Sequence, residues 1–219
     1  MGLFKDRADA GRRLSLELSA YSDNKELLVL GLPRGGVPVA YEVARSLNAP
    51  LDVFIVRKLG VPGREELAFG AIASGDVLVL NEYIVKSMGI SDEVIQDVVE
   101  REKNEFIRRE TEYRGNKPFQ NVTNKTVILV DDGLATGASM RAAIEALKLL
   151  NPNKIVVAVP TASIETCAEF ESIADDIICA ATPHPFRGVG YWYENFSQTT
   201  DEEVKYLLKK SEEFSLRRN

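Results

Sequence analysis

Residues 126–139 of the chain read TVILVDDGLATGAS. The first five residues form an apolar run, which is typical of a strand buried on both faces. Two carboxylates, Asp131 and Asp132, follow that run, and a turn of small residues then opens a predicted helix at residues 137–150. A strand, a short turn and a helix in this order predict a unit of an α/β protein with a parallel sheet.

The rest of the chain repeats this alternation of strands and helices. Short apolar runs predict further strands at residues 27–32, 51–56, 154–159 and 177–181, and two more within 67–80, broken at 74–76. Helical spacing predicts helices at residues 4–21, 38–47, 91–114 and 164–173, and from Asp201 onward. Residues 57–66 are rich in Gly, Pro and charge and predict a mobile loop. We therefore expect an α/β fold of three layers, in which helices flank a mostly parallel, twisted sheet.

The length of 219 residues fits a single domain, residues 1–219. Its core is predicted at residues 22–181. From residue 182 the composition shifts to Pro, Gly and aromatic residues, which predicts a small C-terminal hood at residues 182–219, either alone or together with residues 1–21.

The composition is that of a globular protein: 45% of the residues are hydrophobic and 27% charged. A net charge of -6 argues against a nucleic-acid partner, which would favour a basic surface. No apolar run is long enough to cross a bilayer, and the N-terminus lacks an apolar signal segment. Cys167 and Cys179 form no CxxC pair, so we expect no disulfide and a reducing compartment. These features predict a cytoplasmic protein without a membrane partner.

The turn after Asp132 has the features of a phosphate site. It directs backbone N–H groups, the hydroxyls of Thr136 and Ser139, and the positive end of a helix towards one point. Gly137 allows the backbone to approach a ligand closely. The carboxylates would repel phosphate, so we expect them to accept hydrogen bonds from sugar hydroxyls. In the alternative reading, one Asp only caps the helix, but a cap requires one acid rather than two and a Thr-Gly turn.

Residues 131–139 resemble the signature of the type I phosphoribosyltransferase family, which binds 5-phosphoribosyl-1-pyrophosphate (PRPP). Gly133 departs from that signature, because a branched apolar residue is usual there. The resemblance implies that Asp131 and Asp132 bind the ribose hydroxyls and that residues 134–139 hold the 5′-phosphate. The implied PRPP-binding set is Asp131, Asp132, Gly133, Leu134, Ala135, Thr136, Gly137, Ala138 and Ser139.

Two further segments are similar to the pyrophosphate side of the same family. Residues 31–37, GLPRGGV, resemble its short loop after the first strand, and residues 57–63, RKLGVPG, resemble the start of the flexible loop in adenine-type relatives. The alternatives are an ordinary turn and a solvated basic loop, and for Lys58 we favour function. The implied pyrophosphate-binding residues are Pro33, Arg34, Gly35, Gly36, Arg57 and Lys58.

The chemistry implied by the resemblance is displacement of pyrophosphate from C1 of PRPP by a nucleobase-like acceptor. Arg34 and Lys58 would neutralise the leaving group, and Asp131 and Asp132 would stabilise positive charge on the sugar. These four residues are the predicted catalytic set. Mg²⁺ is the implied cofactor, bound indirectly through PRPP or by the two acids. Ala135 stands where hypoxanthine-type relatives carry an acid, so Glu65 or Glu66 are candidates for a general base.

The aromatic residues of the predicted hood have two interpretations. Phe186, Trp192 and Tyr193 either stack on the acceptor or pack the hood onto the sheet. His184, the single histidine, is predicted to be structural. The helix at 91–114 is a candidate dimer interface, and we expect a homodimer.

The whole chain resembles an uncharacterised group of predicted phosphoribosyltransferases, which names no acceptor. Two functional hypotheses follow. The first is a PRPP-dependent transferase that acts on a small-molecule acceptor. The second is a non-catalytic regulator that binds PRPP or a nucleotide on the same fold.

Overall fold

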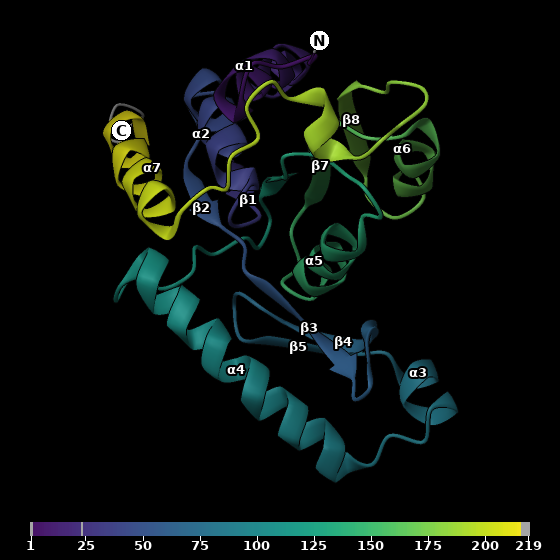
Figure 1. Ribbon diagram of the computed structural model, residues 1–219. Coiled ribbons are helices and arrows are strands. Elements are labelled where there is room, and N and C mark those ends of the chain that lie inside the picture. Colours follow the sequence, from purple (N-terminus) through teal and green to yellow (C-terminus); the bar gives the residue numbers. More distant parts are fainter. Residues whose placement is uncertain (1, 23, 216–219) are drawn as a thin grey trace.

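The computed structural model describes residues 2–22 and 24–215 and contains two sheets (Figure 1). The larger sheet has five parallel strands in the order β2-β1-β6-β7-β8. These strands are β1 (Leu27–Gly31), β2 (Leu51–Val53), β6 (Thr126–Val130), β7 (Lys154–Thr161) and β8 (Asp176–Ala181). The predicted α/β fold with a mostly parallel sheet is therefore confirmed. Residues 1, 23 and 216–219 of the predicted core and hood lie outside the described residues.

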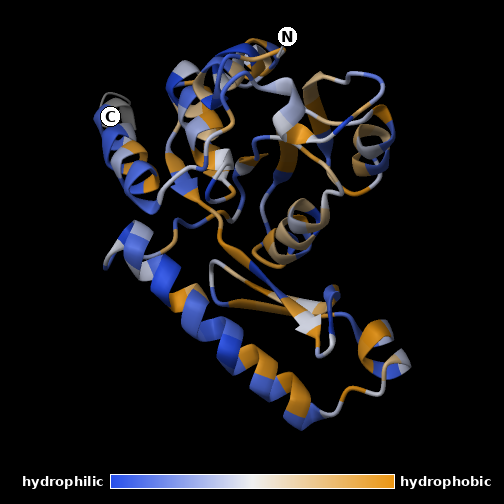
Figure 2. Ribbon diagram, in the orientation of Figure 1, coloured by the Kyte–Doolittle hydropathy of each residue, from blue (hydrophilic) through white to orange (hydrophobic). Residues whose placement is uncertain are grey.

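Helices cover both faces of this sheet. Alternate residues of β6 point to opposite faces: Ile128 packs with α1 (Arg7–Glu17), α2 (Gly36–Ser46) and α7 (Asp201–Ser215). Leu129 packs with α5 (Ala138–Lys148) and α6 (Ile164–Phe170) on the other face. Figure 2 shows the strands of the sheet as mainly hydrophobic and the outer helices as mixed. Apolar residues on both faces explain the continuous apolar runs of the sequence.

A second, antiparallel sheet forms a separate lobe below the first in Figure 1. Its strands are β3 (Val56–Val61), β4 (Arg64–Ala73) and β5 (Val77–Leu80), followed by α3 (Glu82–Ser87) and the long α4 (Asp92–Arg114). Residues of α4 such as Val98 and Phe106 pack against Leu59 of β3. α4 is otherwise largely hydrophilic (Figure 2), so only one of its faces is packed. Ser91 caps this helix, because its Oγ accepts a hydrogen bond from Val94 N.

The prediction of a mobile loop at residues 57–66 is wrong. These residues form most of β3 and the start of β4, joined by a tight turn at 62–63. Leu59 and Val61 are buried against α4, and that contact stabilises a strand in a segment whose Gly and Pro content suggested a loop. α3 was not predicted. The N-terminal helix is shorter than predicted: it begins after Asp6, whose side chain caps it, and ends at Glu17.

The expectation that the cysteines are unpaired is also wrong. Cys167 of α6 and Cys179 of β8 form a disulfide, with their Cα atoms 6.8 Å apart. Spacing in the sequence did not indicate the pair, because folding brings the helix and the strand together. Within the described residues, no helix combines the length and the apolar character that a membrane span requires.

Candidate functional site

The acid pair lies at the carboxyl edge of the parallel sheet, where such sheets bind ligands. Val130 at the end of β6 is aligned with Gly31 at the end of β1, so the turns that follow the two strands are neighbours. Asp131 Oδ1 accepts a hydrogen bond from Asp132 N at 2.8 Å, and Asp132 Oδ2 accepts one from Arg7 Nε at 2.8 Å. No other side chain of the described part of the protein hydrogen bonds to either carboxylate.

The electrostatics of this pair favour a hydrogen-bond donor or a cation as ligand. Burial raises the pKa of Asp131 well above its ordinary value, and the neighbouring charge of Asp132 raises it further. Burial also raises the pKa of Asp132, but the Arg7 guanidinium opposes that increase. Two adjacent carboxylates resist being ionised together without a partner. Sugar hydroxyls, or a cation shared by the pair, would supply such partners.

The turn after the acids is anchored at one end and exposed to solvent at the start of α5. Leu134 N donates to Thr161 O at 2.9 Å, which anchors the turn to the end of β7. Ala135, Thr136 and Ser139 are exposed, and α5 has no side-chain cap. Gly137 has a left-handed φ of 70°, and a Cβ on it would lie 2.5 Å from the Phe170 ring. Exposed amides and hydroxyls at a helix start form a geometry suited to a phosphate.

The turn at residues 33–36 packs directly on the acid pair. A Cβ on Gly35 would lie 2.1 Å from Asp132 Oδ2, and one on Gly36 would lie 2.6 Å from Val130 O. The turn approaches the acids so closely that side chains at both positions would collide with them. The sequence did not indicate this reason for the paired glycines. The Pro33–Arg34 peptide bond is cis, and Arg34 Nη1 lies 3.9 Å from Asp201 Oδ2.

The structure separates the two basic residues of β3. Arg57 turns towards α4, where its Nη2 lies 2.5 Å from Glu102 Oε2. Lys58 lines a cleft of about 550 Å³ between the smaller sheet and α5, and that cleft reaches Ala138, the first residue of α5. Glu66 lines the same cleft, whereas Glu65 Oε1 accepts a hydrogen bond from Gly63 N.

The C-terminal segment passes over the acid pair. Tyr193 Oη donates to Asp132 O at 2.6 Å, and its ring packs 5.4 Å from that of Phe4. The Trp192 ring makes an edge contact with Tyr191, and Phe186 is half-buried. Gly133 departs from the family signature because a Cβ at this position would lie 2.6 Å from the Val189 side chain. Val189 therefore occupies the space that a side chain at residue 133 would need. His184 is exposed.

Arg7 is the site residue that sequence reasoning missed. In addition to its bond to Asp132, it donates from Nη1 to Ser197 O at 2.6 Å and lies over the Phe196 ring at 4.0 Å. Asp132 is 125 residues away in the sequence, so no local pattern pairs the two residues. The nearest signal in the sequence is the segment at residues 4–11, which is part of the resemblance to predicted phosphoribosyltransferases.

The donor set fits a Mg²⁺ ion that a bound ligand helps to hold. The described residues contain no group of three or more His, Cys, Asp and Glu side chains able to hold a metal by themselves. Asp131 and Asp132 offer carboxylate oxygens at one place, and Mg²⁺ commonly binds one or two carboxylates together with the phosphates of a substrate.

The sequence profile described as phosphoribosyl transferase domain matches residues 4–190. The chain therefore belongs to that family, and its parallel sheet with flanking helices is the type I phosphoribosyltransferase fold. A Mycobacterium tuberculosis protein, known from two strains and provisionally named a phosphoribosyl transferase, is 47% identical over 212 residues. The match covers 96% of this chain and 47% of that protein, so the chain spans about half the length of the curated relatives it matches.

A solved structure is also similar over nearly the whole chain. The crystal structure of the protein TT1426 from Thermus thermophilus matches with a TM-score of 0.84 at 39% sequence identity. The match covers 94% of this chain and 98% of TT1426. TT1426 therefore shares this fold over nearly the whole chain.

Proposed function

We propose that this protein binds PRPP and Mg²⁺ and transfers the 5-phosphoribosyl group to a nucleobase-like acceptor, releasing pyrophosphate. One observation carries this proposal: the Asp131–Asp132 pair lies between the open turn of α5 and the glycine turn at residues 33–36. In the reaction, a bond forms between an acceptor nitrogen and C1 while the bond from C1 to the pyrophosphate oxygen breaks. The nitrogen loses its proton to a base, and pyrophosphate leaves with the bonding electron pair.

The sugar and its 5′-phosphate would bind at the edge of the parallel sheet. Asp131 and Asp132 accept hydrogen bonds from the ribose hydroxyls and favour the positive charge that develops at C1. The exposed residues of the turn, Ala135, Thr136 and Ser139, surround the phosphate at the start of α5. A fixed sugar and a fixed phosphate hold C1 in line for attack, which lowers the entropic part of the barrier.

The leaving group would be neutralised from the other side of the site. Arg34 is half-buried in the turn whose glycines pack on the acid pair, and Lys58 lines the cleft that reaches the start of α5. Mg²⁺, when bound, would neutralise negative charge on the pyrophosphate. Because Arg57 pairs with Glu102, we expect Arg57 to act on the pyrophosphate indirectly rather than by direct contact.

The acceptor would bind near the aromatic residues of the C-terminal segment. The buried contacts of Tyr193 with Phe4 and Asp132 support a packing role for its ring, which makes Phe186 and Trp192 the better candidates for stacking on an acceptor. Glu66, in the same cleft as Lys58, is our candidate for the base that removes the acceptor proton. A homodimer and a cytoplasmic location remain predictions from the sequence.

A regulator that binds PRPP or a nucleotide without turnover is the second candidate. Ala135 favours it, because no acid stands at this position of the turn. The two functions are separated by incubating the protein with PRPP, Mg²⁺ and a panel of nucleobases while pyrophosphate release is measured. Release that depends on one base supports the transferase. Saturable PRPP binding without release on any base supports the regulator, and absence of PRPP binding contradicts both.

A further inference from the structure

Helix α4 is linked to each of the three cationic residues on the proposed pyrophosphate side. Glu102 in its middle pairs with Arg57. The other two links start from its last turn, at Glu110, Tyr113 and Arg114, and reach the segments that carry Lys58 and Arg34. These three links join residues that are far apart in the sequence.

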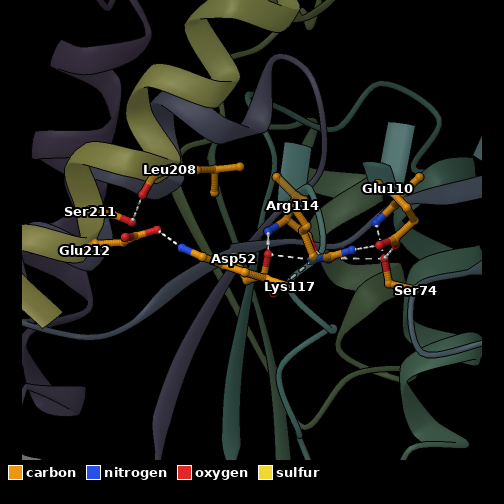
Figure 3. A network of polar contacts seen from close by, with 10 residues as sticks. Asp52, Ser74, Glu110, Arg114, Lys117, Leu208, Ser211 and Glu212 are labelled. Carbon is orange, nitrogen blue, oxygen red and sulfur yellow. Dashed lines mark hydrogen bonds and ion pairs between the residues drawn. The ribbon is translucent and has the colours of Figure 1, made fainter. Parts of the chain in front are cut away.

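The link towards Lys58 is a buried polar cluster (Figure 3). The Arg114 side chain is only 4% exposed, and its Nε lies 2.9 Å from Asp52 Oδ1. Arg114 also donates to Val53 O and to Glu110. The cluster therefore ties the end of α4 to β2, at the point where the chain leaves the larger sheet for the smaller one.

Ser74 extends this cluster to the start of β3. Its Oγ donates to Glu110 Oε1 at 2.6 Å and accepts a hydrogen bond from Ile55 N at 3.0 Å. Ile55 immediately precedes β3, the strand that carries Lys58. The direction in which β3 leaves the larger sheet is thus set by hydrogen bonds that end on Glu110 and Arg114.

The link towards Arg34 runs through α7. Tyr113 Oη donates to Asp201, the first residue of α7, and Asp201 Oδ2 lies 3.9 Å from Arg34 Nη1. Beyond the end of α4, Lys117 pairs with Glu212 of the same helix α7 (Figure 3). The segment around the end of α4 therefore contacts α7 as well as the strand that carries Lys58.

We propose that the last turn of α4 is a positioning element, in which Arg114 and Tyr113 fix the placement of Lys58 and Arg34 for the pyrophosphate group. This inference rests on the proposed function. Burying several charged groups costs desolvation free energy, and a well-packed apolar cluster is often at least as stable. Such a cluster is therefore better explained by the geometry it imposes on the two segments than by the stability it adds.

The test uses two variants that each remove one oxygen atom, Ser74→Ala and Tyr113→Phe, so that the fold is retained; circular dichroism checks this. Calorimetry then measures the affinity for PRPP with Mg²⁺ and for ribose-5-phosphate, which lacks the pyrophosphate. Tyr113→Phe removes the hydrogen bond to Asp201, and Ser74→Ala removes those that Ser74 Oγ makes with Glu110, Ile55 N and Arg114. We expect PRPP to bind about threefold to tenfold more weakly in each variant. Ribose-5-phosphate should bind as it does to the wild type, a selectivity that general loosening of the fold would not produce.

Arg108→Ala is the matched control, because Arg108 lies on the same helix and pairs only with Glu105 and Glu112 of that helix among the described residues. Its affinity for both ligands should stay at the wild-type value. This inference alone would be overturned if the wild type binds both ligands but the variants lose affinity for both equally. It would also be overturned if the variants keep wild-type affinity for both. A wild type that binds neither ligand would overturn the proposed function and this inference with it.

Discussion

The phosphate side of the proposed site lies in one continuous stretch, residues 126–139, whereas the pyrophosphate side is assembled from distant segments. Asp131, Asp132 and the open turn follow directly from β6. Arg34 follows β1, Lys58 lies on β3 of the second sheet, and their supports are in α4 and α7. The comparison shows that the turn after the acid pair follows from local structure, while the placement of separate cations depends on how two lobes are joined.

The largest expected effect concerns the support of the phosphate side. The Cys167–Cys179 disulfide closes a loop of 12 residues and holds α6, whose Phe170 packs against Gly137. Reduction, or Cys179→Ser, should lower the free energy of unfolding by about 3 kcal/mol on the chain-entropy estimate for a loop of this length. Urea unfolding with and without a dithiol measures this. The Cys179→Ser variant should not respond to the dithiol, and equal stability of the oxidised and reduced wild type would contradict the prediction.

The acid pair should dominate binding of the sugar. Asp132→Asn removes an ionised acceptor, and the loss of a charged hydrogen bond corresponds to about tenfold to hundredfold weaker binding of ribose-5-phosphate. The variant relieves the repulsion that the charge of Asp132 exerts on Asp131, but it also removes the buried charge partner of Arg7, so we expect its stability to be lower than that of the wild type. Calorimetry and thermal unfolding report the two quantities. Wild-type affinity in the variant would place the sugar elsewhere.

Gly137 tests whether the turn depends on its backbone conformation. Gly137→Ala places a side chain at a φ of 70° and against Phe170. A left-handed conformation costs roughly 1–2 kcal/mol for a residue with a Cβ, so we expect at least that loss of stability and weaker phosphate binding. Gly63→Ala is a suitable control, because Gly63 also has a positive φ but no atom lies within 4 Å of its Cβ position. A similar loss of phosphate binding in both variants would argue against a specific role for Gly137.

The smallest expected effect separates the two basic residues of β3. Lys58→Ala should weaken PRPP binding by about threefold to tenfold, as expected for one charged contact in a solvated cleft, without affecting ribose-5-phosphate. Arg57→Ala removes a partly exposed ion pair with Glu102 and should change stability by about 1 kcal/mol or less. Calorimetry with both ligands distinguishes them. A larger loss of PRPP binding in Arg57→Ala than in Lys58→Ala would reverse the roles we propose.

The sequence by itself determined the parallel sheet, the position of the acid pair and the turn that follows it. Apolar runs, caps and small-residue turns act over a few residues, and each of these features depends on neighbours in the chain. The same local reasoning predicted a helix at residues 91–114, and α4 spans Asp92–Arg114.

Only the tertiary structure decided the features that join distant segments. They include the strand at residues 57–61, the disulfide, the contact of Arg7 with Asp132, and the cluster around Arg114. In each case the free energy comes from packing or charge pairing between segments far apart in the sequence. Local sequence patterns cannot identify those partners, because the partners become neighbours only when the chain folds.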